Sequence, residues 1–397
     1  MIQRLVHIAT LVAGMALPLA LGGENATSLL VRPDRSTTIE RIAARHGLVI
    51  QRRMDAIRWY QLGLPSGLSM LRTLDRLRRD PQVALVERNG PIESPETDQI
   101  IHAFIDGSPT TTEYVDQDAF ARIKGPEAWP YVTGAPSLVA VLDTGVDLDH
   151  PGLAGHISDG GWDFVADDPV PDDDQDGIDE DGDGEVDEGA GHGTHIAGII
   201  TLVHPNAIIL AVRVLNSDGT GDVGQVASGV IYAVQAGAPV INLSLGLTAD
   251  SQALRDAVAY AVHLGAAVVA SAGNRRTDQP QYPAAYPGVI SVAATDRESL
   301  KADFSNFGAW VAIAAPGVDI YSTFANGQYA VWSGTSFSTA FVSGQVALLL
   351  SVDTTLAPQQ TLPYITGTAE NEDPRYALGA GEVVMRDAAR QAAGGDD

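Results

Sequence analysis

Residues 138–145 are Leu-Val-Ala-Val-Leu-Asp-Thr-Gly, a short apolar run that ends in a carboxylate and a turn. Further apolar runs of strand length follow along the chain, at 208–214, 240–245, 266–270, 289–294 and 311–315. Segments with helical spacing lie between and after them, at 194–202, 224–235, 252–264 and 335–352. Because strands that are apolar throughout are buried on both faces, the pattern predicts an α/β fold with a mostly parallel sheet covered by helices on both faces.

Residues 23–94 predict a small separate unit. Candidate strands and amphipathic helices alternate there, at 26–31, 37–46, 48–64, 68–79 and 83–87. Because 48–64 is long enough for two strands, the order is βαββαβ, which is typical of a ferredoxin-like α+β fold.

The polar stretch 95–112 predicts an exposed linker that is easily cut. We therefore expect the large domain to span 113–397, with an acidic insertion at 167–190.

Charge separates the same two parts of the chain. Residues 23–94 carry 12 arginines and 8 acidic side chains, a net charge of +4, whereas residues 95–397 carry 11 basic and 42 acidic side chains, a net charge of −31. Opposite signs favour two units that attract each other, and so acidic a body disfavours nucleic acid as a partner. The chain is 45% apolar and has no cysteine, which excludes disulfides and cysteine-ligated metal.

The first 22 residues have the pattern of a secretion signal. Arg4 precedes an apolar run at 8–21, and Ala20-Leu21-Gly22 is similar to a small-residue cleavage site. A membrane anchor is the alternative, but the run is short for a membrane span. We expect a secreted or extracytoplasmic protein, and no later stretch that approaches transmembrane length.

Three strings that lie far apart supply a carboxylate, an imidazole and a hydroxyl: Asp143-Thr-Gly, His192-Gly-Thr-His and Ser333-Gly-Thr-Ser336. An imidazole can accept the proton of a serine hydroxyl as the oxygen attacks, and a carboxylate can hold the ring in the right tautomer. Asp143 ends a strand, where open α/β sheets bind ligands. Ser336 begins a helix, whose free N–H groups favour developing negative charge.

Each string also has an ordinary structural interpretation. Asp143 can simply end a strand, and Ser336 can be a helix cap. His192 and His195 can be a structural pair or a metal pair, although no cysteine exists to complete a zinc site. Asp-Thr-Gly also occurs in aspartic proteases, but these need two such carboxylates and the sequence has no second copy. An esterase with these groups needs a Gly-x-Ser-x-Gly elbow, which Gly-Thr-Ser336-Phe-Ser is not.

A fourth string, Ser271-Ala-Gly-Asn274, follows another apolar run. The amide of Asn274 can donate a hydrogen bond to the oxyanion of a tetrahedral intermediate. The alternative is that Asn274 is only a loop residue after glycine.

Together these motifs resemble those of the subtilisin-like serine proteases, the subtilases. The resemblance covers about 121–389 and rests on six strings: Val-Leu-Asp143-Thr-Gly, His192-Gly-Thr-His-Ile-Ala-Gly, Val240-Ile-Asn-Leu-Ser-Leu-Gly246, Ser271-Ala-Gly-Asn274, Ala314-Ala-Pro-Gly317 and Ser333-Gly-Thr-Ser336. It implies a subtilisin-like fold and a secreted serine endopeptidase that hydrolyses proteins or peptides. It also implies that Asp143, His192 and Ser336 form a catalytic triad with Asn274 as the oxyanion donor.

The resemblance extends to substrate binding and to a precursor. It implies two edge segments that pair with an extended peptide, namely Gly219, Thr220 and Gly221, and Ser244, Leu245 and Gly246. Ala272 and Gly273 would line the first specificity pocket. Residues 23–94 look like the family's inhibitory propeptide, so we expect a self-inhibited precursor, cut within 95–112, and a monomer. The alternative is a non-catalytic subtilase relative that acts as a calcium-dependent binding module.

The chain departs from the family pattern in three places. The serine motif continues as Phe337-Ser-Thr-Ala340 and lacks the usual proline, which can alter the helix after the nucleophile. Leu247 replaces a usual second glycine and can narrow the mouth of the pocket. Gly152 replaces an aspartate often found there, so we expect the calcium site that the family commonly builds at this position to be absent.

The acidic insertion holds two Asp-x-Asp-x-Asp-Gly strings, with aspartates at 172, 174, 176, 179, 181 and 183. Hard oxygen ligands at alternate positions followed by glycine match the start of an EF-hand loop, although neither loop has the glutamate at position twelve. We therefore expect structural calcium, held by Asp172, Asp174, Asp176, Asp179, Asp181 and Asp183. The alternative is a solvated acidic loop without an ion.

Overall fold

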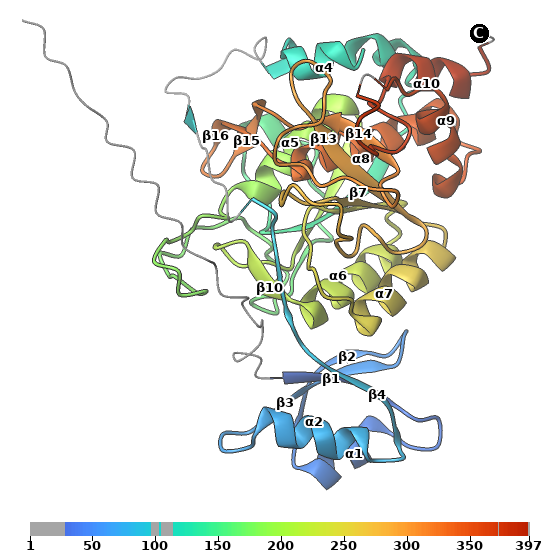
Figure 1. Ribbon diagram of the computed structural model, residues 1–397. Helices are drawn as coiled ribbons and strands as arrows, with labels where there is room; N and C mark the ends of the chain where they lie inside the picture. The colour runs from blue at the N-terminus through green and yellow to red at the C-terminus, as the bar shows by residue number, and fades with distance from the viewer. Residues whose placement is uncertain (1–27, 97–102, 105–113, 372, 396–397) are drawn as a thin grey trace, which may run out of the picture.

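The computed structural model describes residues 28–96, 103–104, 114–371 and 373–395 (Figure 1). The predicted signal, residues 1–22, lies outside the described residues. The large domain is built on a seven-stranded sheet in the order β14-β13-β12-β11-β7-β9-β8, in which all neighbours are parallel. Its strands are β7 (Ser137–Asp143), β8 (Trp162–Asp163), β9 (Ala207–Arg213), β11 (Val240–Leu243), β12 (Ala267–Ser271), β13 (Val289–Thr295) and β14 (Ile313–Pro316).

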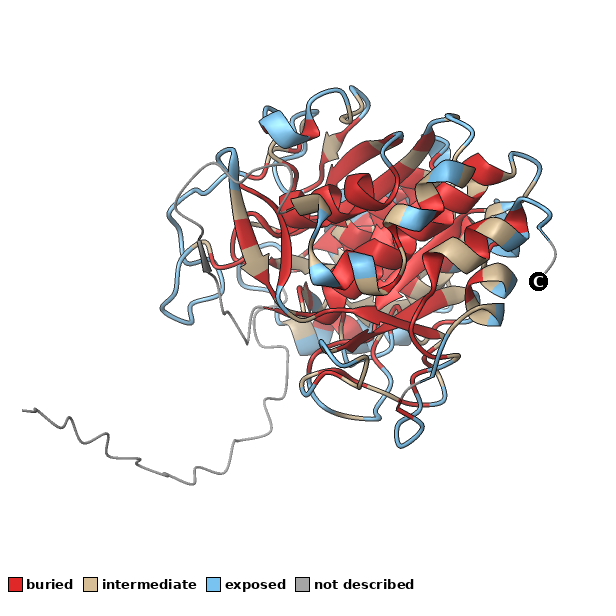
Figure 2. Cartoon of the chain, turned by 90° about the horizontal axis from the view of Figure 1, so that it is seen from above, coloured by how far each residue is buried: buried red, intermediate tan, exposed pale blue. Residues whose placement is uncertain are grey.

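Helices cover both faces of this sheet. The four long helices are α5 (His192–Val203), α6 (Val223–Gln235), α7 (Gln252–His263) and α8 (Thr335–Val352). Val139 and Val141 of β7 pack into the core formed with α5 and α8, whereas Ala140 and Leu142 pack into the core formed with α6 and α7. Figure 2 shows buried residues concentrated between these layers. The predicted parallel α/β fold is confirmed, because period-two alternation places apolar side chains on both faces.

Shorter elements complete the large domain: β10 (Thr220–Asp222), β15 (Ile320–Phe324), β16 (Gln328–Trp332), α4 (Asp118–Arg122), α9 (Leu362–Gly367), α10 (Met385–Ala392), η1 (Pro126–Tyr131), η2 (Pro151–Leu153) and η3 (Pro358–Gln360). In the described part of the chain, α8 alone is long and apolar enough to cross a membrane, and 94% of it is buried inside the fold. The expectation that no later stretch approaches transmembrane length is therefore wrong, because a central core helix has the same composition.

The N-terminal unit has the element order β1 (Ser28–Pro33), α1 (Ile39–His46), β2 (Val49–Met54), β3 (Trp59–Gly63), α2 (Met70–Arg78) and β4 (Val83–Arg88). Its antiparallel sheet has the strand order β2-β3-β1-β4. Leu29 and Val31 pack under α1 and α2, whereas Leu30 and Trp59 enter the core beneath α6 and α7 of the large domain. One face of the small sheet thus forms its own core and the other docks on the large domain (Figure 1).

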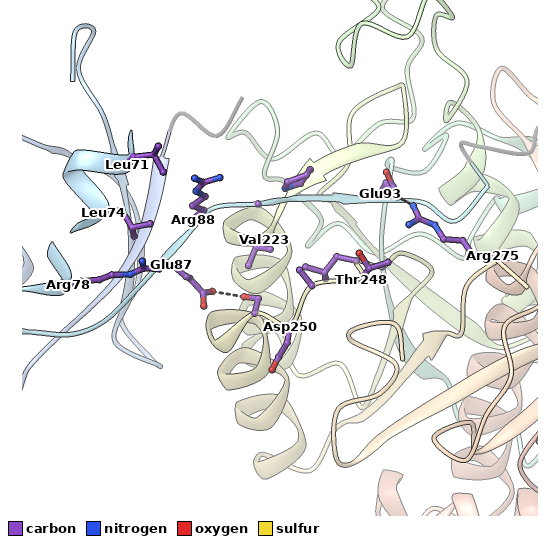
Figure 3. Close-up of a pocket in the computed structure, with 16 residues that line it drawn as sticks. Leu71, Leu74, Arg78, Glu87, Arg88, Glu93, Val223, Thr248, Asp250 and Arg275 are labelled. Carbon is purple, nitrogen blue, oxygen red and sulfur yellow. Dashed lines mark hydrogen bonds and ion pairs between the residues drawn. The ribbon is translucent and has the colours of Figure 1, made fainter. Parts of the chain in front are cut away.

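Polar contacts reinforce this docking at the first turns of two helices. Glu87 accepts hydrogen bonds from Ser251 Oγ at 2.6 Å and from Gln252 N at 3.0 Å, so it caps α7 from the other unit (Figure 3). Asn89 Oδ1 accepts a bond from Gly224 N, at the start of α6, at 2.9 Å. An open crevice of about 580 Å³ separates Leu71 and its neighbours on α2 from the large domain. Apolar side chains do not fill this part of the boundary, so the two helix caps supply contacts between the units there.

Candidate active site

Three backbone elements bring the predicted triad together. Asp143 is the last residue of β7, next to the middle of the sheet, and His192 and Ser336 lie in the first turns of α5 and α8. Gly191 precedes His192 with φ 86°, and a Cβ there would lie 2.4 Å from the ring of Phe324. Glycine is therefore required at the point where the chain turns into α5.

The carboxylate and the ring are in direct contact. His192 Nδ1 lies 2.6 Å from Asp143 Oδ1, and both side chains are fully buried. The ring also packs edge-on against Trp332, with centroids 5.4 Å apart, and against Phe337. The contact fixes the ring orientation and leaves Nε2 directed toward the cleft.

A carboxylate that the sequence analysis missed lies between the ring and the serine. Glu96 Oε2 accepts a hydrogen bond from Ser336 Oγ at 2.7 Å and lies 3.1 Å from His192 Nε2. Only 1% of Glu96 is exposed. The prediction that 95–112 is an exposed linker is therefore wrong for Glu96. Its buried carboxylate is stabilised by contacts with His192 Nε2, Ser336 Oγ, Ser336 N and Asn274 Nδ2. Farther along, backbone pairing joins β6 (Ala103–Phe104) to β16.

Two donors converge on the other oxygen of Glu96. Asn274 Nδ2 donates to Oε1 at 3.0 Å, and the backbone N–H of Ser336 donates to the same atom at 3.3 Å. Asn274 Nδ2 also donates to the carbonyl of Pro95 at 3.1 Å. Thr335 fixes the amide, since its N–H and hydroxyl both donate to Asn274 Oδ1. The arrangement is a pocket for a negatively charged oxygen.

The charges in this site are strongly coupled. Burial alone would lower the pKa of His192, but Asp143 and Glu96 outweigh it and raise the pKa to about 10. Burial raises the pKa of Glu96, but hydrogen bonds from His192, Ser336 and Asn274 leave it below its usual value. At neutral pH the site therefore holds a protonated ring between two carboxylates, a state in which the ring cannot accept a further proton.

The segment that carries Glu96 lies between the two predicted edge segments. Strand β5 (Pro91–Glu93) pairs antiparallel with β10, with Glu93 opposite Thr220 and Ile92 opposite Gly221. Glu93 also exchanges backbone hydrogen bonds with Gly246, at 2.8 and 3.3 Å. The segment thus becomes the middle strand of a short three-stranded arrangement.

The other predicted binding residues lie around the same segment. The N–H of Ser94 donates to the carbonyl of Gly219 at 2.9 Å. Ser244 Oγ donates to the carbonyl of Ser336 at 3.1 Å, and Leu245 is fully buried. Ala272 and Gly273 directly precede Asn274, and Leu247 pairs with Tyr282 through two backbone bonds.

The acidic insertion gathers only some of the predicted ligands. Asp179, Asp181 and Asp183 have ligand oxygens within 4.8 Å of one another, and so do Asp181, Glu188 and Asp218. Asp172, Asp174 and Asp176 belong to neither cluster among the described residues, so the structure does not support the first string as a calcium loop. The second string closes because Gly182 and Gly184 adopt left-handed turns, with φ of 82° and 99°.

Asp173, which the sequence analysis also missed, holds the start of α5. It is 4% exposed and accepts hydrogen bonds from Gly191 N at 3.0 Å, Thr194 N at 3.1 Å and Thr194 Oγ1 at 2.5 Å. Its immediate neighbours, Asp172 and Asp174, are both acidic, so the local sequence resembles a solvated run and does not reveal a buried capping residue.

Comparisons with known proteins show which family this chain resembles. Residues 134–382 match the model of the subtilase family of peptidases. Thermitase from Thermoactinomyces vulgaris is 44% identical over 240 residues, which cover 58% of this chain and 80% of thermitase. Subtilisin DY from Bacillus licheniformis is 36% identical over 270 residues, which cover 65% of this chain and 92% of that protein.

A solved structure shows the same fold. The crystal structure of fervidolysin from Fervidobacterium pennivorans, described as a keratinolytic enzyme related to subtilisin, aligns with a TM-score of 0.76 at 24% identity. The alignment covers 94% of this chain and 62% of fervidolysin.

Proposed function

The chain belongs to the subtilase family and is a serine-type endopeptidase, and on that premise we propose that Asp143, His192 and Ser336 are its catalytic triad. In this proposal Ser336 Oγ attacks the carbonyl carbon of the scissile peptide bond while His192 Nε2 accepts the hydroxyl proton. Asp143 orients the ring through the 2.6 Å contact at Nδ1. Asn274 Nδ2 and the N–H of Ser336 stabilise the oxyanion.

The rest of the cycle follows from the same groups. His192 returns the proton to the leaving nitrogen as the C–N bond breaks, which leaves an acyl group on Ser336. Water then attacks this ester with His192 again as the base, and the carboxylate product and the free hydroxyl are released. The observation that carries the proposal is that Ser336 Oγ, His192 Nε2 and Asn274 Nδ2 all contact the carboxylate of Glu96.

We also propose that the chain is made as a self-inhibited precursor with 23–94 as its propeptide and 95–112 as the processing region. Support comes from the segment 91–96, which pairs with both edges of the cleft and ends on the triad. The carbonyl in the segment that contacts Asn274 is that of Pro95, so we assign the first self-cleavage to the Pro95–Glu96 bond.

Glu96 keeps this bond intact in the precursor. Its carboxylate takes the hydrogen bond of the Ser336 hydroxyl, the contact of His192 Nε2 and both oxyanion donors. The side chain must leave this position before Ser336 can attack Pro95. Self-inhibition in this form rests on one charge as well as on the strand pairing.

Three broader statements complete the proposal. Secretion is proposed from the signal pattern of 1–22, and extended proteins or peptides are the proposed substrates because β10 and the Gly246 edge pair with a strand. We propose a structural calcium ion in the insertion 167–190, where Asp179, Asp181 and Asp183 converge. When bound, the ion would neutralise repulsion among these carboxylates and supply no step of the reaction. A monomer remains our expectation.

Ser336→Ala tests the catalytic proposal. We expect the loss of peptidase activity by about six orders of magnitude, the loss that removal of the nucleophile causes in subtilisin, and a precursor that stays uncut at Pro95–Glu96 in mass spectra. Ser66→Ala, at an exposed serine of the N-terminal unit, should behave like the wild type. A serine-directed phosphonate should label the processed protein at Ser336 alone. Processing of pure Ser336→Ala would contradict self-cleavage, and an unlabelled Ser336 would favour a non-catalytic relative.

A further inference from the structure

Besides the group formed by Asp179, Asp181 and Asp183, a second group of carboxylates joins the acidic insertion to the turn before β10. Asp181 and Glu188 belong to the acidic insertion, whereas Asp218 lies in the turn before β10, and their ligand oxygens lie within 4.8 Å of one another. Glu188 is 7% exposed and Asp218 is fully buried. The group thus lies where the insertion touches the loop that leads into the substrate-pairing strand; Figure 1 shows the insertion as the green loop beside β10.

The carboxylate of Glu188 is buried without a hydrogen bond to any other described residue. Neither of its carboxylate oxygens has a hydrogen-bond partner among the described residues, and no ion pair in that part of the chain joins a lysine or arginine to Asp181, Glu188 or Asp218. A buried carboxylate that is neither paired nor hydrogen-bonded is strongly destabilising unless a proton or a cation neutralises it. One of these unpartnered oxygens lies within 4.8 Å of an oxygen of Asp181 and an oxygen of Asp218, which is the arrangement of a site for a hard cation.

Two backbone hydrogen bonds fix the position of the Asp218 carboxylate. One of its oxygens accepts a hydrogen bond from Asp187 N at 2.8 Å and the other from Glu180 N at 2.6 Å. These two bonds fasten the insertion at both ends of its second turn. Each carboxylate oxygen has two lone pairs, so both oxygens of Asp218 retain the capacity to ligate a metal.

We propose that a Ca²⁺ ion binds between Asp181, Glu188 and Asp218 and fastens the acidic insertion to the strand that pairs with the substrate. This inference rests on the proposed substrate role of β10 and extends the proposed calcium site, whose Asp181 it shares. Oxygen ligands alone, three of them anionic, favour Ca²⁺, and the exposed side of Asp181 leaves room for the water ligands that Ca²⁺ accepts.

The position of the site couples it to both halves of the catalytic machinery. Asp218 directly precedes Gly219, whose carbonyl receives the bond from Ser94. Gly189, next to Glu188, donates its N–H to Ser217 O at 2.9 Å and accepts a bond from His192 N at 3.1 Å. A Cβ at Gly189 would lie 2.2 Å from the nitrogen of Gly219. An ion at this junction therefore fixes the substrate edge and the turn before His192 at the same time.

Calcium titration of the full-length Ser336→Ala precursor tests the site without any use of catalysis. After chelation, we expect Ca²⁺ to produce binding heat and to raise the melting temperature. Glu188→Gln and, separately, Asp218→Asn should weaken the affinity at this site by about tenfold or more, because each removes a charged ligand. Glu185→Gln is the matched control, since it removes one charge from an exposed residue of the same insertion that belongs to neither cluster.

Peptide kinetics on the processed enzyme test the coupling. Calcium should lower KM for a peptide long enough to pair with β10 and leave KM for a single-residue ester unchanged, and Glu188→Gln should lose this difference. Equal calcium affinity of Glu188→Gln, Asp218→Asn and Glu185→Gln would overturn the site. Loss of binding in Asp179→Asn with full binding in Glu188→Gln would place the ion only among Asp179, Asp181 and Asp183, and would also overturn it. Because the titration needs no activity, failure of the proposed peptidase mechanism would leave these binding results unaffected.

Discussion

At the scale of single residues, Asp143 and Glu96 together set the ionisation of His192, the proposed catalytic base. With Glu96 in place the pKa of His192 is raised to about 10, so the ring is protonated at neutral pH and cannot accept the proton of Ser336. A base with a raised pKa becomes neutral only as the pH rises toward that value. Self-processing of the precursor should therefore accelerate between pH 7 and 10, whereas the processed enzyme, which lacks Glu96 in its site, should reach full activity at lower pH.

Glu96→Gln tests this relation. The amide removes one of the two carboxylates that raise the pKa of His192, and each unit by which the pKa falls gives about tenfold more neutral ring near pH 7. We expect the purified variant to process itself about tenfold faster at pH 7.5, with its pH profile displaced to lower pH. Gel densitometry between pH 6 and 10 measures both. Glu93→Gln, in the same segment but paired with Arg275 at the surface, is the control; equal rates for the two variants would refute the role of Glu96.

At the scale of secondary structure elements, Glu87 caps α7 across the boundary between the two units. Its carboxylate accepts bonds from Ser251 Oγ, Gln252 N and Ala253 N, and a negative charge at a helix N-terminus is also favoured by the helix dipole. Glu87→Ala should weaken docking of the N-terminal unit by about 1–2 kcal/mol. The measurement is the urea concentration at which this unit becomes protease-sensitive in the Ser336→Ala precursor.

The matched control for this cap is Glu40→Ala in the same unit. Glu40 makes an ion pair with Arg53 in which both side chains are about half exposed, and such surface pairs contribute little. If both variants lower equally the urea concentration at which the N-terminal unit becomes protease-sensitive, the loss of docking comes from the change in net charge, and the helix cap contributes nothing to docking.

The same scale separates what the sequence could predict from what it could not. The apolar run at 138–142 predicts β7 to within a residue at either end, because a strand buried on both faces needs apolar side chains at every position. Asp143, His192, Ser336 and Asn274 follow such runs or open helices, so their convergence could be expected from motifs. Glu96 and Asp218 could not be found in this way, since their local sequences are polar and their burial arises only from contacts with distant segments.

At the scale of the whole molecule, the two units carry opposite charge. Residues 23–94 have a net charge of +4 and residues 95–397 of −31. Arg32 pairs with Asp256 on α7 at 2.7 Å with both side chains partly exposed, whereas Leu30, Met54 and Trp59 are buried at the same junction. Long-range attraction and apolar burial thus both hold the N-terminal unit, the proposed propeptide, on the body, and they respond differently to salt.

Salt should therefore act in opposite directions on the precursor and on the processed enzyme. At about 0.1 M salt the screening length is only about 10 Å, so raising NaCl from about 0.02 to 0.5 M should weaken the attraction and release the cut propeptide faster. The same screening relieves self-repulsion within the body and should raise its melting temperature. Recovery of peptidase activity after self-cleavage measures the first effect and calorimetry of the processed enzyme the second, with sucrose as a non-ionic control. A release rate that does not change with NaCl would mean that apolar burial and the helix caps alone hold the two units together.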